Sequence, residues 1–159
     1  MGSMILENKT ILVVDDEPDV LTIVEEEICE ACPTCRLDKA TDYETAASLL
    51  QTREYDAVIL DIMGVRGFDL LEIAVKRKFK AAMLTAHALS AETLEKAHRL
   101  GARTYLPKSR LGQIVPFLED LFVYDHKTGW KRLLDRLGDL FDKQFESGWR
   151  SKYDIKNWY

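Results

Sequence analysis

The sequence contains little of what marks membrane, secreted or nucleic-acid-binding proteins. It has no apolar run of membrane-spanning length, and its start lacks the basic-then-apolar pattern of a signal peptide. Its 22 Lys and Arg are outnumbered by 27 Asp and Glu, and the net charge of −5 argues against nonspecific nucleic-acid binding. We therefore expect a cytoplasmic protein that binds neither membranes nor nucleic acid.

Cysteine is scarce as well, and the three cysteine residues lie close together in the sequence, at Cys29, Cys32 and Cys35. An odd number of thiols fits a reducing compartment. Closely spaced thiolates can bind zinc or an iron–sulfur cluster, but a structural zinc site is usually closed by four ligands, and no fourth cysteine lies nearby. We favour a structural role, with Cys29 on the inner face of a helix and the other two in the turn after it. A metal site stays the less favoured alternative.

The sequence does contain a regular alternation of short apolar runs and segments of helical periodicity. The chain is 47% apolar and 31% charged, typical of a globular protein that forms a core without disulfides. The predicted strands are 10–14, 36–40, 57–60, 81–84 and 104–106, and the predicted helices are 18–32, 43–50, 68–77, 91–100 and 111–122. Continuous apolar strands are typical of a parallel sheet covered on both faces. This alternation predicts a doubly wound α/β domain.

Polar residues follow the apolar runs at the points where the predicted strands end. They are Asp15, Asp16, Asp61, Thr85 and Lys108. In a doubly wound sheet, ligands bind at the carboxyl ends of the strands. Three carboxylates there can surround Mg²⁺, which prefers oxygen ligands, while a lysine can neutralise a phosphate oxygen and a threonine hydroxyl can donate a hydrogen bond to it.

Four short motifs carry a resemblance to a known family. They are Val13-Val-Asp-Asp-Glu-Pro18, Val58-Ile-Leu-Asp-Ile-Met63, Met83-Leu-Thr-Ala86 and Gly101-Ala-Arg-Thr-Tyr-Leu-Pro-Lys108. In this order, on a matching ladder of strands and helices, they resemble the motifs of two-component response-regulator receiver domains over roughly residues 8–122. The resemblance implies a flavodoxin-like fold, with a five-stranded parallel sheet in the order 2-1-3-4-5.

The resemblance also implies the chemistry of the predicted site. Asp61 is the phosphoacceptor, which takes a phosphoryl group from a histidine kinase or phosphotransfer protein. Mg²⁺ is bound by Asp15, Asp16, Asp61 and the backbone carbonyl of Met63. Members of the family are regulatory domains rather than enzymes, and they catalyse only their own phosphotransfer and hydrolysis.

Three further residues have roles that come from the resemblance alone. Lys108 binds the phosphoryl group, Thr85 is the switch hydroxyl, and Tyr105 is the switch aromatic that turns inward when Thr85 moves. Considered singly, an aromatic residue in a strand is more often part of the core. The prediction of these three roles therefore depends on the residues occurring together, and not on any one of them.

The sequence departs from the family pattern at two places. The loop 62–68 after Asp61 is shorter than usual and lacks the family's Met-Pro. Lys108 is normally followed by a proline, whereas here Ser109 follows it and Pro107 precedes it. A cis bond before a residue other than proline is costly, so we expect a different backbone geometry at this lysine. Neither departure removes a reactive group.

Two other functions compete with this prediction. A haloacid-dehalogenase-like phosphohydrolase also uses an aspartyl nucleophile, but it requires a second aspartate two residues later, where this chain has Met63. The chain also lacks an insertion large enough for a substrate-covering cap. The second alternative, a degenerate receiver that only binds proteins, is disfavoured by the retained polar set but stays open because the loops differ.

The last part of the chain, residues 124–159, has a different character. It holds 8 Lys and Arg against 6 Asp and Glu from position 125 onward, and an apolar stripe recurs every three or four residues from Trp130 to Phe145. We expect Thr128 to cap this helix, Gly148 to end it, and an irregular segment to follow.

We divide the chain into a lead-in over 1–7, whose Met1-Gly2-Ser3 resembles a cloning remnant, a receiver domain over 8–123 and an amphipathic extension over 124–159. The stripe can pack on its own domain, form a homodimer or bind another protein. We favour an interaction role, in a stand-alone regulator that acts on an unknown downstream protein.

Overall fold

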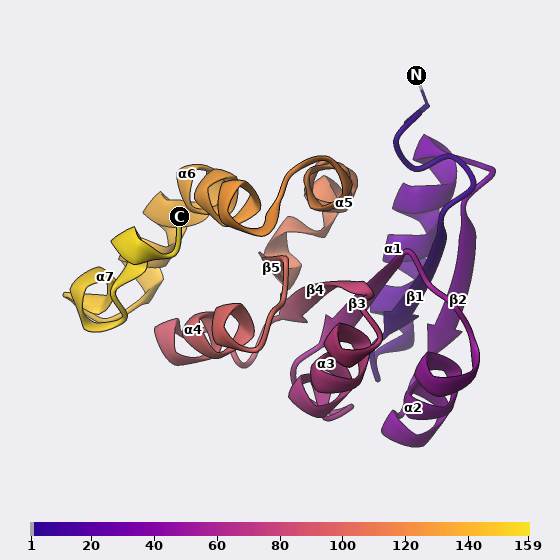
Figure 1. Ribbon diagram of the computed structural model, residues 1–159, viewed down its shortest axis with the longest axis horizontal. Coiled ribbons are helices and arrows are strands. Elements are labelled where there is room, and N and C mark those ends of the chain that lie inside the picture. Colours follow the sequence, from indigo (N-terminus) through magenta and orange to yellow (C-terminus); the bar gives the residue numbers. More distant parts are fainter. Residues whose placement is uncertain (1) are drawn as a thin grey trace.

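Five parallel strands form the centre of the molecule, and the computed structural model in Figure 1 describes residues 2–159. The strands are β1 (Thr10–Val14), β2 (Arg36–Ala40), β3 (Ala57–Asp61), β4 (Lys80–Thr85) and β5 (Thr104–Pro107). They lie in the order β2-β1-β3-β4-β5, and every neighbouring pair is parallel. The predicted fold class and strand order are confirmed.

Helices cover both faces of this sheet. One face carries α1 (Pro18–Ala31) and α5 (Ile114–Val123), and the other carries α2 (Tyr43–Thr52), α3 (Gly67–Lys76) and α4 (Ala91–Arg99) (Figure 1). All of β3 and all but the first residue of β1 and β4 are buried. Burial from both sides is the reason why these strands read as continuous apolar runs.

Side-chain caps fix the starts of α2 and α4 at the predicted positions, Tyr43 and Ala91. Asp42 caps α2 by accepting from the backbone N–H of Thr45, and Ser90 caps α4 in the same way. The predicted helix 111–122 is divided into a 3₁₀ helix, Lys108–Gln113, and α5. The division falls at Gln113, whose backbone lies outside the helical region (φ −105°, ψ 11°), and the 3₁₀ helix itself is kinked at Arg110.

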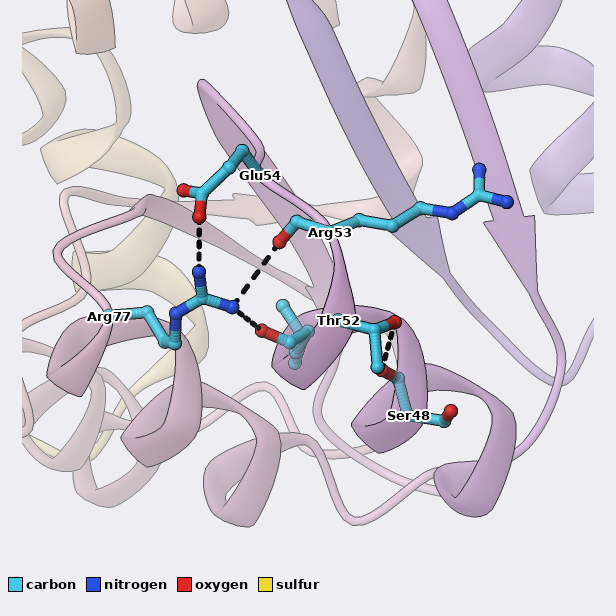
Figure 2. A network of polar contacts seen from close by, with 6 residues as sticks. Ser48, Thr52, Arg53, Glu54 and Arg77 are labelled. Atoms are coloured by element: carbon cyan, nitrogen blue, oxygen red, sulfur yellow. Dashed lines mark hydrogen bonds and ion pairs between the residues drawn. The ribbon is translucent and has the colours of Figure 1, made fainter.

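Arg77 connects the ends of α2 and α3. Figure 2 shows its guanidinium group directed at the C-terminal end of α2, where it bonds the carboxylate of Glu54 and the backbone oxygen of Arg53. The same group donates to the backbone oxygen of Leu50 at 2.7 Å. These bonds satisfy carbonyl groups that the end of a helix leaves without partners.

The predicted lead-in packs against the core, although its first residue lies outside the described residues. Leu6 is fully buried in the core. The backbone N–H of Ser3 donates to the Ala31 oxygen at 2.6 Å, and its hydroxyl donates to Glu119 at 2.8 Å. The segment therefore packs where α1 and α5 meet, a long-range contact that no local pattern reveals.

The cysteines are placed differently from their prediction in one respect. Cys32 and Cys35 are buried, as a structural role requires, but Cys29 is exposed on α1 rather than on its inner face. Burial raises the pKa of Cys35 to about 11, so that its thiol stays protonated. Within residues 2–159, no set of three or more potential ligands includes a cysteine, and the alternative metal site is unsupported.

The extension forms α6 (His126–Gln144), α7 (Trp149–Lys152) and a short 3₁₀ helix (Ile155–Asn157). Asp125 caps α6 by accepting the N–H of Thr128 at 2.7 Å, so the predicted capping role of Thr128 is wrong. Gly148 does not end α6 but precedes α7 with a positive φ of 79°. None of the helices in residues 2–159 combines the length and apolar character needed to cross a membrane.

The apolar stripe of α6 packs on its own domain. Its buried members are Trp130, Leu133, Leu134, Leu137 and Phe141. Figure 1 shows α6 beside β5 at the sheet edge, between α4 and α5, and Trp130 donates from Nε1 to the backbone oxygen of Ala102 at 2.9 Å. The interaction role that we favoured for this stripe is wrong, because the domain itself buries it. Dimerisation through other surfaces stays a prediction.

Aromatic rings attach the end of the extension to α4. The ring of His98 stacks on Trp158 with centroids 4.0 Å apart, and His126 and Trp130 lie at 5.3 and 5.1 Å from it. Burial, assisted by the neighbouring His126, lowers the pKa of His98 to about 4. The docked extension therefore holds this imidazole in its neutral form.

This arrangement predicts a pH-dependent extension. Because the folded pKa of His98 lies below its ordinary value of 6.5, its stabilising contribution is complete above pH 6.5 and is lost as the pH falls toward 4. The loss reaches about 3 kcal/mol at most. Tryptophan emission during an acid titration measures it, and His98→Phe, which keeps a ring for stacking, should respond less. Superimposable titration curves for the two proteins would contradict the prediction.

Candidate phosphoryl site

The carboxyl ends of four strands meet at one edge of the sheet. Asp15 directly follows β1, Asp61 ends β3, Thr85 ends β4, and Lys108 directly follows β5. Adjacent parallel strands end side by side, so these residues lie close together, and Asp61, Thr85 and Lys108 line one pocket. The pocket is lined by Asp16, Glu17, Asp61, Met63, Gly64, Thr85, Ala86, His87, Ala88 and Lys108.

Three carboxylates converge in this place. Asp15, Asp16 and Asp61 each offer an oxygen, and these oxygens lie within 4.8 Å of one another. Asp15 and Asp61 are buried, whereas Asp16 is exposed at the mouth. No other such set occurs among residues 2–159. Oxygen donors crowded in this way repel one another, and they fit a hard divalent cation such as Mg²⁺.

Lys108 supplies the positive charge within this acidic group. Its Nζ lies 2.8 Å from Oδ2 of Asp15, 3.2 Å from Oδ1 of Asp61 and 3.5 Å from Oε1 of Glu17. The peptide bonds of residues 2–159 are all trans, and the lysine opens the 3₁₀ helix after β5. The replacement of the usual proline by Ser109 therefore leaves Lys108 inside the site.

Burial and charge shift the pKa values of these groups. Burial raises the pKa of Asp61 to about 6, with a further contribution from the negative charge of Asp15. Burial also raises the pKa of Asp15 despite its hydrogen bond to Lys108. For Lys108 burial acts in the opposite direction, but its bonds to the two carboxylates outweigh burial and raise its pKa. The lysine is therefore a permanent cation.

The Thr85 hydroxyl is buried and makes no hydrogen bond with any residue in the 2–159 range. Such a group normally costs on the order of 1–3 kcal/mol. It lies in the same pocket as Asp61, so a ligand oxygen bound there can accept its hydrogen bond. The unpartnered hydroxyl is therefore evidence for a site that is completed by a ligand.

Tyr105 lies on β5 and has no exposed surface. Its hydroxyl lies 2.8 Å from Oγ1 of Thr93 and accepts the backbone N–H of Ser90 at 3.5 Å. On its other side, the ring meets Phe141 edge to face at 6.0 Å. The predicted switch aromatic thus points inward and touches the extension.

Sequence reasoning missed the residues that shape the short loop after β3. A Cβ atom on Gly64, whose φ is 86°, would lie 2.3 Å from the carboxylate of Asp16. A Cβ atom on Gly67 would lie 1.9 Å from the backbone oxygen of Asp61. The presence of two glycines within seven residues could have indicated this tightly packed loop. No feature of the sequence indicated the ion pair of Glu17 with Lys108.

The match to a protein family agrees with this geometry. The family model described as the response regulator receiver domain matches residues 11–115, more than half of the chain. The chain belongs to the response regulator receiver family. The resemblance seen in the motifs is therefore confirmed, together with a place in two-component signalling. A sequence search of curated proteins found no match.

Solved receiver structures share the fold. A response regulator from Thermotoga maritima is 19% identical, with a TM-score of 0.65 over 74% of this chain and 99% of that one. The phosphorylated cyanobacterial phytochrome response regulator RcpA is 16% identical, with a TM-score of 0.64 over 73% and 94%. A CheY-like receiver domain protein from Methanospirillum hungatei is 21% identical, with a TM-score of 0.57 over 86% and 95%. At these identities the likeness establishes the fold alone.

The close approach at Gly64 yields a test of the acidic cluster. Gly64→Ala should displace the Asp16 carboxylate and weaken Mg²⁺ binding roughly tenfold, while the fold persists. Gly148→Ala is the matched control, because Gly148 also has a positive φ of 79° and its new Cβ would meet nothing within 4 Å. Isothermal titration with Mg²⁺ compares the two variants, and equal affinities would contradict the proposed contact.

The raised pKa of Asp61 yields a second test, carried out with a chelator present. A carboxyl group whose folded pKa is raised stabilises the protein below its unfolded pKa of 3.8, and this contribution is lost as the pH rises through 6. Asp61→Asn should therefore raise the free energy of unfolding by roughly 2–3 kcal/mol at neutral pH. The gain should shrink toward pH 3.8. Urea unfolding followed by circular dichroism measures it, with the substitution of an exposed carboxylate of α6, Asp139→Asn, as the control.

Proposed function

We propose that Asp61 accepts a phosphoryl group in a Mg²⁺-dependent reaction and that the chain signals by changing its protein contacts. The observation that carries this proposal is the convergence of Asp15, Asp16 and Lys108 on Asp61, beside the unpartnered hydroxyl of Thr85. A structural cluster of acidic residues requires neither the buried lysine nor the unpartnered hydroxyl.

The donor set fits a magnesium ion. Asp15, Asp16 and Asp61 would bind it, and the backbone carbonyl of Met63, in the loop at the pocket, is proposed as a further ligand. When bound, the ion relieves the repulsion between these carboxylates and the oxygens of an incoming phosphate.

The residues of the chain have separate parts in the transfer. An oxygen of Asp61 forms a bond to phosphorus while the bond from phosphorus to the donor's leaving group breaks. Lys108, held 3.2 Å from Asp61, can follow a phosphoryl oxygen and balance its charge. The Thr85 hydroxyl can donate to another phosphoryl oxygen. Transfer of this kind depends mainly on positioning and electrostatic stabilisation.

The proposal also covers the partners of the protein, its domain boundaries and the reactions that it catalyses. The donor would be a histidine kinase or phosphotransfer protein in the cytoplasm, and a downstream protein would recognise the altered surface. Residues 8–123 would form the receiver domain and residues 124–159 its extension. As a regulatory domain, it would catalyse only its own phosphorylation and dephosphorylation.

Exposure to acetyl phosphate with Mg²⁺, followed by intact mass measurement, tests this function. We expect one phosphoryl adduct on the native protein and on Asp139→Asn, and none on Asp61→Asn or after removal of Mg²⁺ with EDTA. The absence of any adduct on the native protein would overturn the proposal and leave the degenerate, protein-binding receiver as the better description.

A further inference from the structure

Arg66, the last residue of the short loop 62–66 between β3 and α3, has an unusual backbone conformation. Its φ of 56° and ψ of 54° lie in the left-handed region, which is unfavourable for residues other than glycine. Glycine occurs at positions 64 and 67, yet an arginine occupies this position. A strained residue beside a candidate site indicates that the surrounding contacts hold it in place.

The side chain of Arg66 makes two contacts that can offset this strain. Its guanidinium group lies over the ring of Tyr43, 4.0 Å from the centroid, and its Nε donates to Oδ2 of Asp69 at 2.9 Å. Tyr43 is the first residue of α2 and packs against the core, whereas Asp69 belongs to the first turn of α3. The stack of Arg66 on Tyr43 therefore ties the loop to α2, which lies beside α3 in Figure 1.

The middle of the same loop touches the candidate metal site. The backbone at Gly64 lies against the carboxylate of Asp16, so closely that a Cβ atom there would be 2.3 Å from it. Met63 and Gly64 both line the pocket of the site. The shape of the loop backbone therefore determines where these groups lie relative to a bound ion.

The loop is too short for its end to move independently of its middle. The N–H of Gly67 donates to the backbone oxygen of Ile62 at 3.1 Å and closes the loop. A closed loop of this size has few alternative conformations, and Arg66 is only two residues from Gly64. Loss of the left-handed conformation at Arg66 would therefore move residues 63 and 64 as well.

We propose that the stack of Arg66 on Tyr43 holds the loop in the shape that completes the metal site, so that these two side chains are positioning residues for Mg²⁺ binding. The inference rests on the proposed function, because the loop borders the same metal site. Neither side chain lines the pocket, and both act through the backbone of residues 63 and 64. The loop that departs from the family pattern is thereby held in place from α2.

The charge of Arg66 separates positioning from electrostatics. A cation near a binding site repels Mg²⁺, so the removal of this arginine would by charge alone strengthen Mg²⁺ binding. Loss of the stack instead releases the loop and weakens Mg²⁺ binding. The two explanations therefore predict changes of opposite sign for Arg66→Gly.

The same substitution separates positioning from general stability. Glycine adopts the left-handed conformation without strain, so the urea midpoint of Arg66→Gly should change little although the stack is lost. A merely structural contact would lower the urea midpoint and the Mg²⁺ affinity together. A fall in Mg²⁺ affinity alone therefore identifies a positioning role.

The experiment measures two properties of the full-length protein: Mg²⁺ affinity by isothermal titration, and hydrogen exchange of the Gly67 amide with EDTA present. In Tyr43→Leu and in Arg66→Gly we expect the affinity to fall and the exchange to accelerate, each by roughly twofold to fivefold, the range that one exposed cation–π pair supplies. The double variant should be no weaker than either single variant, because both changes remove the same contact.

Two further variants test whether the ring of Tyr43 is responsible. Tyr43→Phe keeps an aromatic face for the arginine and should restore the native affinity and exchange. Tyr124→Leu removes a comparable pair beyond the end of α5, in which Arg132 lies 4.4 Å from the ring centroid, and should leave both quantities unchanged.

The outcomes keep this inference apart from the proposed function. If the native protein gains an adduct from acetyl phosphate while Tyr43→Leu and Arg66→Gly bind Mg²⁺ as tightly as it does, the positioning role is overturned and the phosphoacceptor function stands. Stronger binding by Arg66→Gly would overturn the role too, since it would reveal a charge effect. If both variants bind Mg²⁺ more weakly but the native protein gains no adduct, the role stands and the function fails. A native protein that binds no Mg²⁺ would overturn both.

Discussion

The ion pairs of Lys108 with Asp15 and Asp61, at the end of the sheet, are the interaction on which the rest of the structure depends. Asp15 and Asp61 are both buried, and Lys108 lies within 3.2 Å of each. Without this cation, two ionised carboxylates would face each other in a site of low polarity, at a cost of several kcal/mol per charge. The lysine reduces the repulsion between the carboxylates but leaves the site with a net negative charge. That negative charge fits a divalent metal ion.

This contact exists because the sheet is parallel and doubly wound. Each strand ends at the same edge, so residues from β1, β3, β4 and β5 meet there although they are far apart along the chain. The same topology leaves β5 at the outer edge of the sheet. An apolar edge strand exposed to water invites pairing with other chains, and α6 covers it.

The extension therefore has a structural role before any regulatory one. It buries the stripe that begins at Trp130, and it seals Tyr105 from solvent. Surfaces on that side of the domain are not free for a partner while α6 is docked. Any protein that binds at β5 would have to compete with the extension.

Local pattern was sufficient to predict the strands, the sheet class and the group of polar residues at the strand ends, whereas the roles of these residues in a phosphoryl site come from the family resemblance and stay predictions. Apolar runs and helical spacing are properties of neighbouring residues, and Asp61 and Lys108 were recognisable because they stand directly at or after strand ends. The positions of both remained correct even where the family pattern was broken, since backbone topology places them. Capping was less predictable: Asp125 rather than Thr128 caps α6, because either side chain can cap a helix and the path of the chain selects one.

Only the tertiary structure revealed which segments bury the apolar faces of the helices. The amphipathic stripe predicted a partner for α6 but carried no information on whether that partner was another chain or its own β5. The exposure of Cys29, the burial of Leu6 and the meeting of Tyr105 with Phe141 are equally long-range. Sequence periodicity shows that a face must be buried, whereas the identity of what buries it depends on contacts between segments distant along the chain.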